Sequence, residues 1–403
     1  MAQYHSFTTK LKLNNRQKTL MARHAGFSRW VYNWGLAMWK DAYNQGLKPN
    51  TKTLKRLFTN HVKPDYPWMN ELSSKVYQYA FINLGESFKR FFKGLGKYPR
   101  FKCKGVEDRF TIDNSGRPIR LSGLCHKLPF IKWVRTFEPL PDCLTKKVTI
   151  YKKAGDWYIS FSIKKTFEPT SKVIERVGVD FGVKTLAVLS SGVEFKGLQP
   201  YRNAQQKLAR VQRNLAQKVK GSQNREKALL QVQKLHLRVA NIRKDYLHKM
   251  TTYIAKNHST VVIEDLNISG MMANHKLSKA IGEAGLHEAR RQLQYKCERY
   301  GTKLVIADRF FPSSQRGMRR ACKPESIPAC SRLCSNCGNR QSMPLSERVY
   351  DCDCCGNKID RDWNASLNLE RYNEYGSTSF ACGGLTAPMP PLKQELNTQS
   401  IVM

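Results

Sequence analysis

Three separated carboxylates in this sequence have surroundings that suit metal-dependent chemistry. Asp180 lies in the segment GVDFG, Glu264 follows the apolar run TVVI, and Asp362 lies in the segment DRDWNA. Carboxylates that end hydrophobic strands or open a helix commonly hold catalytic metal ions against a phosphodiester. The pattern therefore favours metal-dependent cleavage of nucleic acid.

Each acid alone also has a structural explanation. A strand-end aspartate often makes a turn hydrogen bond, and an acid at a helix start can serve as a cap. If an RNase H-like sheet draws the three together, they would hold two Mg²⁺ ions, with Asp180 bridging them and Glu264 and Asp362 each completing one site. Asp265 and Asp360 are rival ligands that the residues alone leave open.

Four cysteines form a second chemical pattern just before the third acid. They occur as two C-x-x-C-G knuckles separated by a short strand-like segment: Cys334, Cys337, Cys352 and Cys355. This spacing is typical of a tetrathiolate zinc ribbon, in which four thiolates leave no open coordination position. We expect a structural Zn²⁺ without a catalytic role.

The composition indicates a polyanionic partner. The chain has 403 residues, 41% of them hydrophobic, which is enough for two or more domains. Lys and Arg number 69 against 31 acids, a formal net charge of +38. No apolar run is long enough to span a bilayer, and residues 1–13 lack the apolar centre of a signal peptide. We expect a bacterial cytoplasmic protein, nucleoid-associated when bound to DNA and with no membrane partner, whose cysteines are thiols or metal ligands.

The elements that position these residues can be traced along the chain. A strand at 3–13 precedes an amphipathic helical segment, and short strands at 110–112, 119–121, 147–151 and 157–163 then predict a small β-barrel interrupted by helices. A second set of strands follows at 177–181, 185–189, 193–195, 260–263 and 303–307, with helices at 285–300 and 362–372. Between them, residues 200–257 predict a basic helical hairpin broken near Gly221.

The basic hairpin has two interpretations. It is either a solvated charged face or a wall along a phosphate backbone, and the charge of the whole chain favours the wall.

The ordered set of motifs resembles the TnpB (OrfB-type) proteins of bacterial insertion sequences, relatives of type V CRISPR effectors. It includes the acid and cysteine motifs, WVYN at 30–33, YPRFK at 98–102, RKDYLHK at 243–249, FPSSQ at 311–315, ACG at 381–383 and KQE at 393–395.

The resemblance implies an α/β multidomain, Mg²⁺-dependent, RNA-guided DNA endonuclease. The implied domains are a wedge-type β-barrel (1–14 and 95–170), a helical recognition insert (15–94), a RuvC-like nuclease domain (171–332 and 358–372), a zinc ribbon (333–357) and a flexible tail (373–403). Guide RNA from the transposon end would pair with double-stranded DNA beside a short flanking motif.

The resemblance also implies residue roles. Asp180, Glu264 and Asp362 match the catalytic acids of the family, and this match favours them over Asp265 and Asp360. The four knuckle cysteines match the zinc ligands of the family. Nucleic-acid contacts are expected at Gln78, Arg238, Arg243, Lys244 and Lys249. Because the neighbouring Ser74 departs from the family pattern, the flanking motif that relatives read is not transferred here.

One departure from the family is a basic stretch at 316–332 ahead of the first knuckle, which contains Cys322 and Cys330. An exposed loop is the simplest interpretation, although Cys322, Cys330 and Cys354 are alternative zinc ligands. Two other functions stay open: a nuclease-inactive RNA-guided repressor of the same fold, and a DNA transposase with two-metal chemistry.

Overall fold

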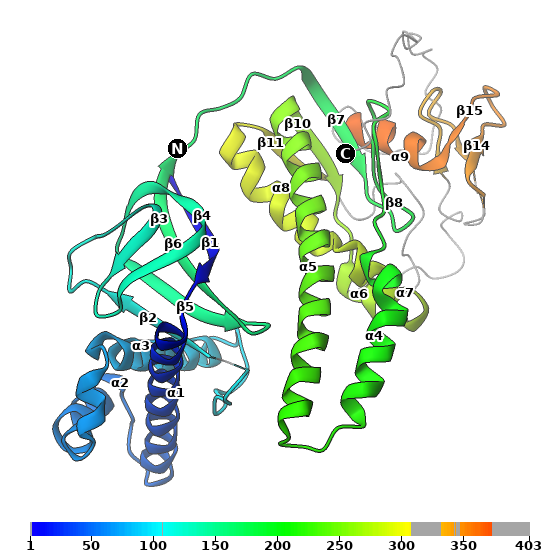
Figure 1. The fold of residues 1–403 in the computed structure, drawn as a ribbon. Coiled ribbons are helices and arrows are strands. Elements are labelled where there is room, and N and C mark those ends of the chain that lie inside the picture. The colour runs from blue at the N-terminus through cyan, green and yellow to red at the C-terminus, as the bar shows by residue number, and fades with distance from the viewer. Residues whose placement is uncertain (1, 107, 308–331, 342, 344–346, 373–403) are drawn as a thin grey trace. The chain divides into compact units, whose positions relative to one another are not determined.

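The chain forms two compact units, Ala2–Thr166 and a second that begins at Phe167 (Figure 1). The computed structural model describes residues 2–106, 108–307, 332–341, 343 and 347–372. The division between the units falls after Thr166, whereas the sequence-based boundary of the β-barrel was placed at residue 170. Thr170 belongs to the second unit because its backbone N–H donates to Tyr300 and its hydroxyl donates to the Lys256 carbonyl. No helix of the described residues is long and apolar enough to cross a membrane.

The first unit contains a six-stranded antiparallel sheet. Its strands are β1 (Ala2–Lys12), β2 (Arg109–Asp113), β3 (Ile119–Leu128), β4 (Lys132–Thr145), β5 (Lys147–Lys153) and β6 (Asp156–Thr166), in the order β2-β5-β6-β1-β4-β3. The predicted β5–β6 hairpin is confirmed, since Lys153 pairs with Asp156 across a turn in which Ala154 and Gly155 both have positive φ. The strand β4 was not predicted.

A helical segment lies between β1 and β2. It comprises α1 (Asn15–Asn44), α2 (Thr51–Leu57), three short turns (Phe58–Val62, Lys63–Asp65 and Pro67–Glu71) and α3 (Ser74–Phe92). Asn14 caps α1 because its side chain accepts a hydrogen bond from the Gln17 backbone N–H, and the Gln17 side chain accepts one from the Asn14 backbone N–H. The apolar faces of α1 and α3 meet around the fully buried Phe58, so the apolar face of the predicted amphipathic helical segment is mostly core.

The second unit is built on a five-stranded mixed sheet. Its strands are β7 (Ile174–Asp180), β8 (Thr185–Leu189), β9 (Glu194–Lys196), β10 (His258–Glu264) and β11 (Lys303–Ala307), in the order β11-β10-β7-β8-β9. β7, β10 and β11 are parallel, whereas β8 and β9 are antiparallel additions. The carboxyl ends of three parallel strands therefore share one edge.

Helices cover the two faces of this sheet (Figure 1). The helices of this unit in the described residues are α4 (Pro200–Ala216), α5 (Gln223–Asn257), α6 (Ile268–Ala273), α7 (His275–Ala284), α8 (Leu286–Tyr300) and α9 (Arg361–Glu370), and α5, α8 and α9 are the ones that pack on the sheet. α5 and α8 pack on the face that carries Val177, Val179 and Ile263, while Leu369 of α9 packs on Val262. The predicted hairpin is observed as α4 and α5, and Arg225 of α5 donates to the carbonyls of Leu215, in the last turn of α4, and of Lys218, just after it.

A buried lysine joins α5 to α8. Lys296 Nζ donates to the His248 carbonyl (2.8 Å) and to the hydroxyls of Thr251 (2.7 Å) and Thr252 (2.8 Å). None of these partners is a carboxylate, and burial lowers the pKa of Lys296 from 10.5 to about 8. Folding therefore makes the charged form of Lys296 less favourable than it is in the unfolded chain.

This lysine gives a pH prediction. Between about pH 8 and 10.5 the unfolded chain binds a proton that the folded chain has released, so the stability of the folded protein rises with pH across this window. Below about pH 8 the lysine is charged in both states, and the full destabilisation from burying its charge is present. NMR titration of ¹³Cε-labelled lysines should give Lys296 a midpoint near 8, with the signal identified by its loss in Lys296→Met. A midpoint near the ordinary lysine value would contradict the assignment.

Candidate metal sites at the sheet edge and the ribbon

Asp180 and Glu264 are placed side by side by the register of two parallel strands. β7 and β10 pair through Ile263 opposite Val179, and each strand ends one residue later at these acids. Neighbouring strands lie about 4.8 Å apart, and residues in register point to the same face. That face is the one covered by α9, because side chains alternate and Val262 packs on α9. Both acids are buried, with 7% and 6% exposure.

Asp362 is brought to the same edge by the way α9 lies on β7. The Arg176 guanidinium donates to the Glu370 carbonyl, and Gly178 lies directly beneath Ser366 and Glu370. The helix therefore runs antiparallel to the strand, and one helical turn matches about two strand residues. Asp362 lies one turn before Ser366 on this face, and Asp180 lies two residues after Gly178. This places Asp362 at the same edge of the sheet as Asp180 and Glu264, although the carboxylate oxygens of the three acids do not all lie within 4.8 Å of one another in this structure.

Gly178 is required for this close approach. A Cβ at Gly178 would overlap the Ser366 carbonyl oxygen and lie 2.5 Å from the Glu370 nitrogen, and both are backbone atoms that cannot rotate away. The neighbouring Ser190 completes the junction by accepting from the Gly178 N–H (3.0 Å) and the Trp363 indole (3.1 Å). The glycine thus sets the distance between the strand and the helix that carries the third acid.

We expect Gly178→Ala to loosen α9 and destabilise the second unit by about 1–3 kcal/mol or more, as in overpacked cores. Thermal unfolding and hydrogen exchange of α9 would measure the effect. Gly282→Ala is a matched control in the same unit, because its nearest neighbour is the Met272 methyl at 3.7 Å. Equal stability of the two variants would contradict this packing.

The rival acids have other partners. Asp360 caps α9, with its Oδ1 accepting from the backbone N–H groups of Asp362 (2.9 Å) and Trp363 (3.1 Å). Asp265 pairs with Arg290 of α8. Arg348 Nη1 lies 3.8 Å from Asp362 Oδ2, a distance that leaves this half-exposed pair weak.

The four knuckle cysteines meet in one cluster. Cys334 and Cys355 have sulfurs 3.7 Å apart, and those of Cys337 and Cys352 are 3.6 Å apart. A tetrahedral ion with Zn–S bonds of about 2.3 Å requires sulfurs about 3.8 Å apart, so the donor set fits zinc. Among the described residues, these cysteines are the one group of three or more potential ligands whose donor atoms all lie within 4.8 Å. Cys354 is exposed and outside this group. Cys322 and Cys330 lie outside the described residues, as does the stretch 316–331.

The two knuckles have the same local geometry. The short strand pairs β12 (Arg332–Leu333) with β13 (Arg340–Gln341), and β14 (Val349–Asp351) with β15 (Lys358–Asp360), flank them. Gly338 (φ 73°) and Gly356 (φ 67°) each donate back to the first cysteine of their knuckle. This left-handed turn explains the glycine in C-x-x-C-G.

Burial and hydrogen bonds shift the pKa values of the thiols in this cluster. Burial raises the pKa of Cys334 and Cys337. Burial acts in the same direction on Cys355, but hydrogen bonds from the Asn357 backbone and the Asn336 amide outweigh it and lower the pKa of Cys355 to about 7. Metal ligation requires thiolates, so zinc binding releases protons and weakens as the pH falls.

Buried asparagines attach the ribbon to α9. The Asn364 amide accepts from the Ser335 N–H (2.9 Å) and donates to the Leu333 carbonyl (2.9 Å), to which Asn368 also donates (2.8 Å). The ribbon is thereby fixed to the helix that carries Asp362. Our reading of the sequence missed these two residues, although two asparagines four positions apart among apolar helix residues were a visible signal.

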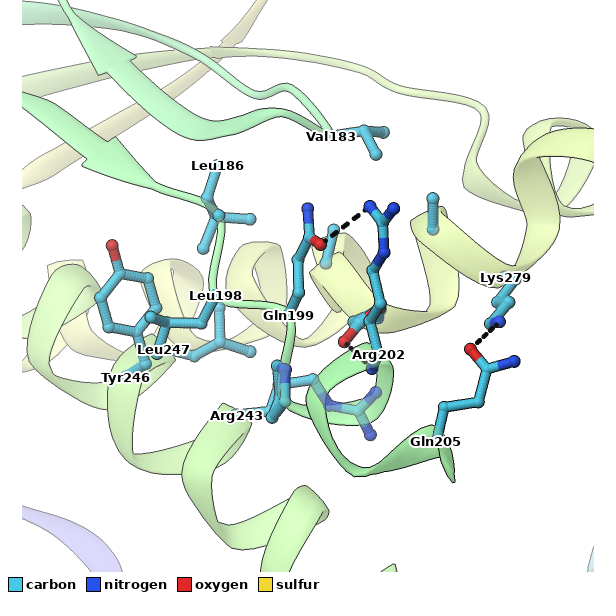
Figure 2. Close-up of a pocket in the computed structure, with 15 residues that line it drawn as sticks. Val183, Leu186, Leu198, Gln199, Arg202, Gln205, Arg243, Tyr246, Leu247 and Lys279 are labelled. Atoms are coloured by element: carbon cyan, nitrogen blue, oxygen red, sulfur yellow. Dashed lines mark hydrogen bonds between the residues drawn. The ribbon is translucent and has the colours of Figure 1, made fainter. Parts of the chain in front are cut away.

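The predicted nucleic-acid contacts are scattered. Arg238, Lys244 and Lys249 are exposed on α5, with Lys249 paired to Asp245, and Gln78 is half-buried on α3 of the first unit. Arg243 instead lines a cavity of about 240 Å³ between α4, α5 and α7, and its guanidinium donates to the Gly282 carbonyl at 2.7 Å (Figure 2). Arg243 therefore links α5 to α7 through this hydrogen bond. Its contact with nucleic acid stays a prediction.

A comparison with solved structures shows which known fold this chain resembles. The chain aligns with the structure titled "Cryo-EM structure of the Cas12f1-sgRNA-target DNA complex" over 92% of its own length and 99% of the other chain, with a TM-score of 0.52 at 11% identity. The chain therefore has an α/β multidomain fold that it shares with this Cas12f1 structure. The domain details expected from the sequence, a wedge-type barrel and a recognition insert, are not tested by this likeness.

Sequence relatives define the family. "Putative RNA-guided DNA endonuclease" of Streptomyces pristinaespiralis is 32% identical over 94% of this chain and 90% of the relative, and "Putative RNA-guided DNA endonuclease InsQ" of Escherichia coli is 32% identical over 98% of both. Family models described as "Probable transposase" and "Cas12f1-like, TNB domain" match residues 150–275 and 328–369. The chain belongs to the TnpB (OrfB-type) family, which confirms the resemblance. A model described as "Helix-turn-helix domain" matches residues 1–48, where the structure has one strand and one long helix.

Proposed function

We propose that this chain is a transposon-encoded, RNA-guided DNA endonuclease. The observation that supports the nuclease chemistry is that Asp180 and Glu264 end neighbouring parallel strands in register, at the edge toward which the packing of α9 directs Asp362. The guide requirement is supported by two relatives with RNA-guided endonuclease names that match over at least 90% of both chains. The net charge of +38 suits a protein that holds both a guide RNA and double-stranded target DNA.

The three acids would hold two Mg²⁺ ions, with Asp180 as the bridging ligand. Hard carboxylate oxygens are the donors that Mg²⁺ prefers. When bound, the ions would polarise the phosphodiester and activate water. The cap role of Asp360 and the ion pair of Asp265 with Arg290 support Asp362 and Glu264 as the ligands. The buried packing around Asp180 and Glu264 would hold both carboxylates in place before a substrate arrives.

The four cysteines would hold a structural Zn²⁺. Their sulfur spacing fits this ion, and four thiolates complete its coordination. Because Asn364 binds the first knuckle, the folded ribbon would keep α9 and Asp362 in position.

Sequencing the RNA that co-purifies with the full chain tests the proposed function. A discrete transcript with a variable 3′ end is expected, and that end would identify the guide and its target. A heterogeneous cellular RNA population would contradict RNA guidance, and strand-transfer products from the purified protein would point instead to a transposase. The flanking motif and a cytoplasmic, nucleoid-associated location stay predictions.

A further inference from the structure

The loop after α3 is strongly basic and forms no strand or helix in its described part. Residues 93–106 carry five cations and no acid: Lys93, Lys97, Arg100, Lys102 and Lys104. This segment contains the YPRFK motif, to which the proposed nuclease chemistry gives no role. Its charge indicates a surface that meets a polyanion.

The loop is nevertheless fixed to α1. Asn33 clasps the backbone of Lys102 on both sides, since its amide donates to the Lys102 carbonyl (3.0 Å) and accepts from the Lys102 N–H (2.8 Å). One turn earlier on α1, Arg29 pairs with Asp108, and both side chains are mostly buried. Pro99 is also buried. Two motifs, WVYN and YPRFK, thus form one structural unit.

This fixed loop, together with the last residue of α3, exposes aromatic rings, which proteins usually bury. Phe101 is 49% exposed, Phe92 69% and Tyr98 39%. Tyr98 packs edge-on against the buried Phe88 and against Phe91, so the core supports this ring from below. Lys40 Nζ lies 4.8 Å from the centre of the Phe101 ring and 5.8 Å from that of Tyr98. We call Phe92, Tyr98, Phe101, Lys40 and Arg100 the aromatic platform.

We propose that the aromatic platform stacks an unpaired base of single-stranded RNA on Phe101, with Arg100 and the neighbouring lysines on its phosphates. Exposed rings among cations are the usual device for holding single strands, because every base has a face that can stack. A duplex presents only its stacked edges and backbone. A second copy that docked through the same loop would place cations against cations.

The test measures RNA binding to the full-length chain, freed of nucleic acid and without Mg²⁺. Phe101→Ala should weaken binding of a fluorescein-labelled oligouridine by about tenfold, and Phe101→Trp should restore it, because stacking is worth about 1–3 kcal/mol per base. Binding of double-stranded RNA of the same length should not change. The proposal depends on the proposed function only in naming RNA as the partner. The assay needs no cleavage, so a chain that stacks RNA but does not cut DNA would be recognised as such.

Phe137 supplies a matched control. It is 55% exposed in the same unit, and Lys10 Nζ lies 5.0 Å from its ring centre. Phe137→Ala should leave RNA binding unchanged, and RNA carrying 5-iodouridine should photo-crosslink to the 98–102 peptide. The proposal is overturned if Phe101→Ala binds like the parent, if both alanine variants lose affinity equally, or if duplex binding falls in parallel with single-strand binding.

Discussion

Asp180→Ala is expected to abolish Mg²⁺-dependent DNA cleavage while guide RNA binding is retained. As the proposed bridging ligand, Asp180 would serve both metal ions, and metal ions contribute several kcal/mol of transition-state stabilisation. A loss of that size lowers the rate on the order of a thousandfold or more. The side chain ends a strand whose packing depends on Val177 and Val179, so the fold should survive. Single-turnover cleavage and RNA binding by the same preparation measure both properties.

The neighbouring acids provide controls for this variant. Asp360→Asn should cleave normally, because asparagine caps a helix about as well as aspartate. Asp265→Asn should also retain cleavage, since the ion pair with Arg290 that it weakens is about one-third exposed and contributes little. Full Mg²⁺-dependent cutting by Asp180→Ala, or loss of cutting in Asp360→Asn alone, would show that the metal ligands are assigned wrongly.

Cys352→Ser is expected to release zinc and unfold the ribbon. Structural zinc contributes about 10–16 kcal/mol to the folding of small ribbons, which no apolar core of this size can replace. Within the described residues, the ribbon core comprises Cys334, Met343, Tyr350 and Cys352, with Ile359 packed against it. Zinc content by mass spectrometry should fall from one ion per chain to near zero. Hydrogen exchange in α9 should rise, because Asn364 loses its partner Ser335.

Cys354→Ser is the control for the zinc prediction. Cys354 lies in the same knuckle but is exposed and outside the sulfur cluster. This variant should keep one zinc ion and normal exchange in α9. Unchanged zinc in Cys352→Ser would instead mean that another thiol completes the site.

The positions of Asp180 and Glu264 at the carboxyl ends of two strands were predictable because the sequence pattern that sets them is local. Each acid follows or opens an element whose apolar pattern is clear, and parallel strands bring their carboxyl ends together. The choice between neighbouring acids rested on the family resemblance. The structure adds a physical account, because Asp360 is occupied as a cap and Asp265 pairs with Arg290.

The junctions were not predictable from local patterns. The close approach of α9 to Gly178 depends on residues almost two hundred positions apart, and a glycine in a strand gives no partner. The docking of the ribbon through Asn364 is equally non-local. Arg243 looked like a phosphate contact, yet only tertiary packing shows that its guanidinium is turned toward the Gly282 carbonyl.

The strand β4 was missed for a local reason. Pro139 and Pro141 fall inside it, and prolines argue against a strand in most sequences. Its burial alternates only in parts, so the period-two signal is weak. The long pairing with β3 sustains the strand despite its prolines. Tertiary contacts here override local preference.

Reprogramming the guide tests the central claim most directly. The purified chain is loaded with its co-purified RNA, or with the same RNA carrying a new variable end, and given Mg²⁺ and plasmids in which either target lies beside a randomised flank. We predict that cleavage follows the guide, is limited to plasmids sharing one short flanking motif, and disappears in Asp180→Ala. Cleavage that ignores the guide, or target binding that leaves both plasmids intact, would contradict the account.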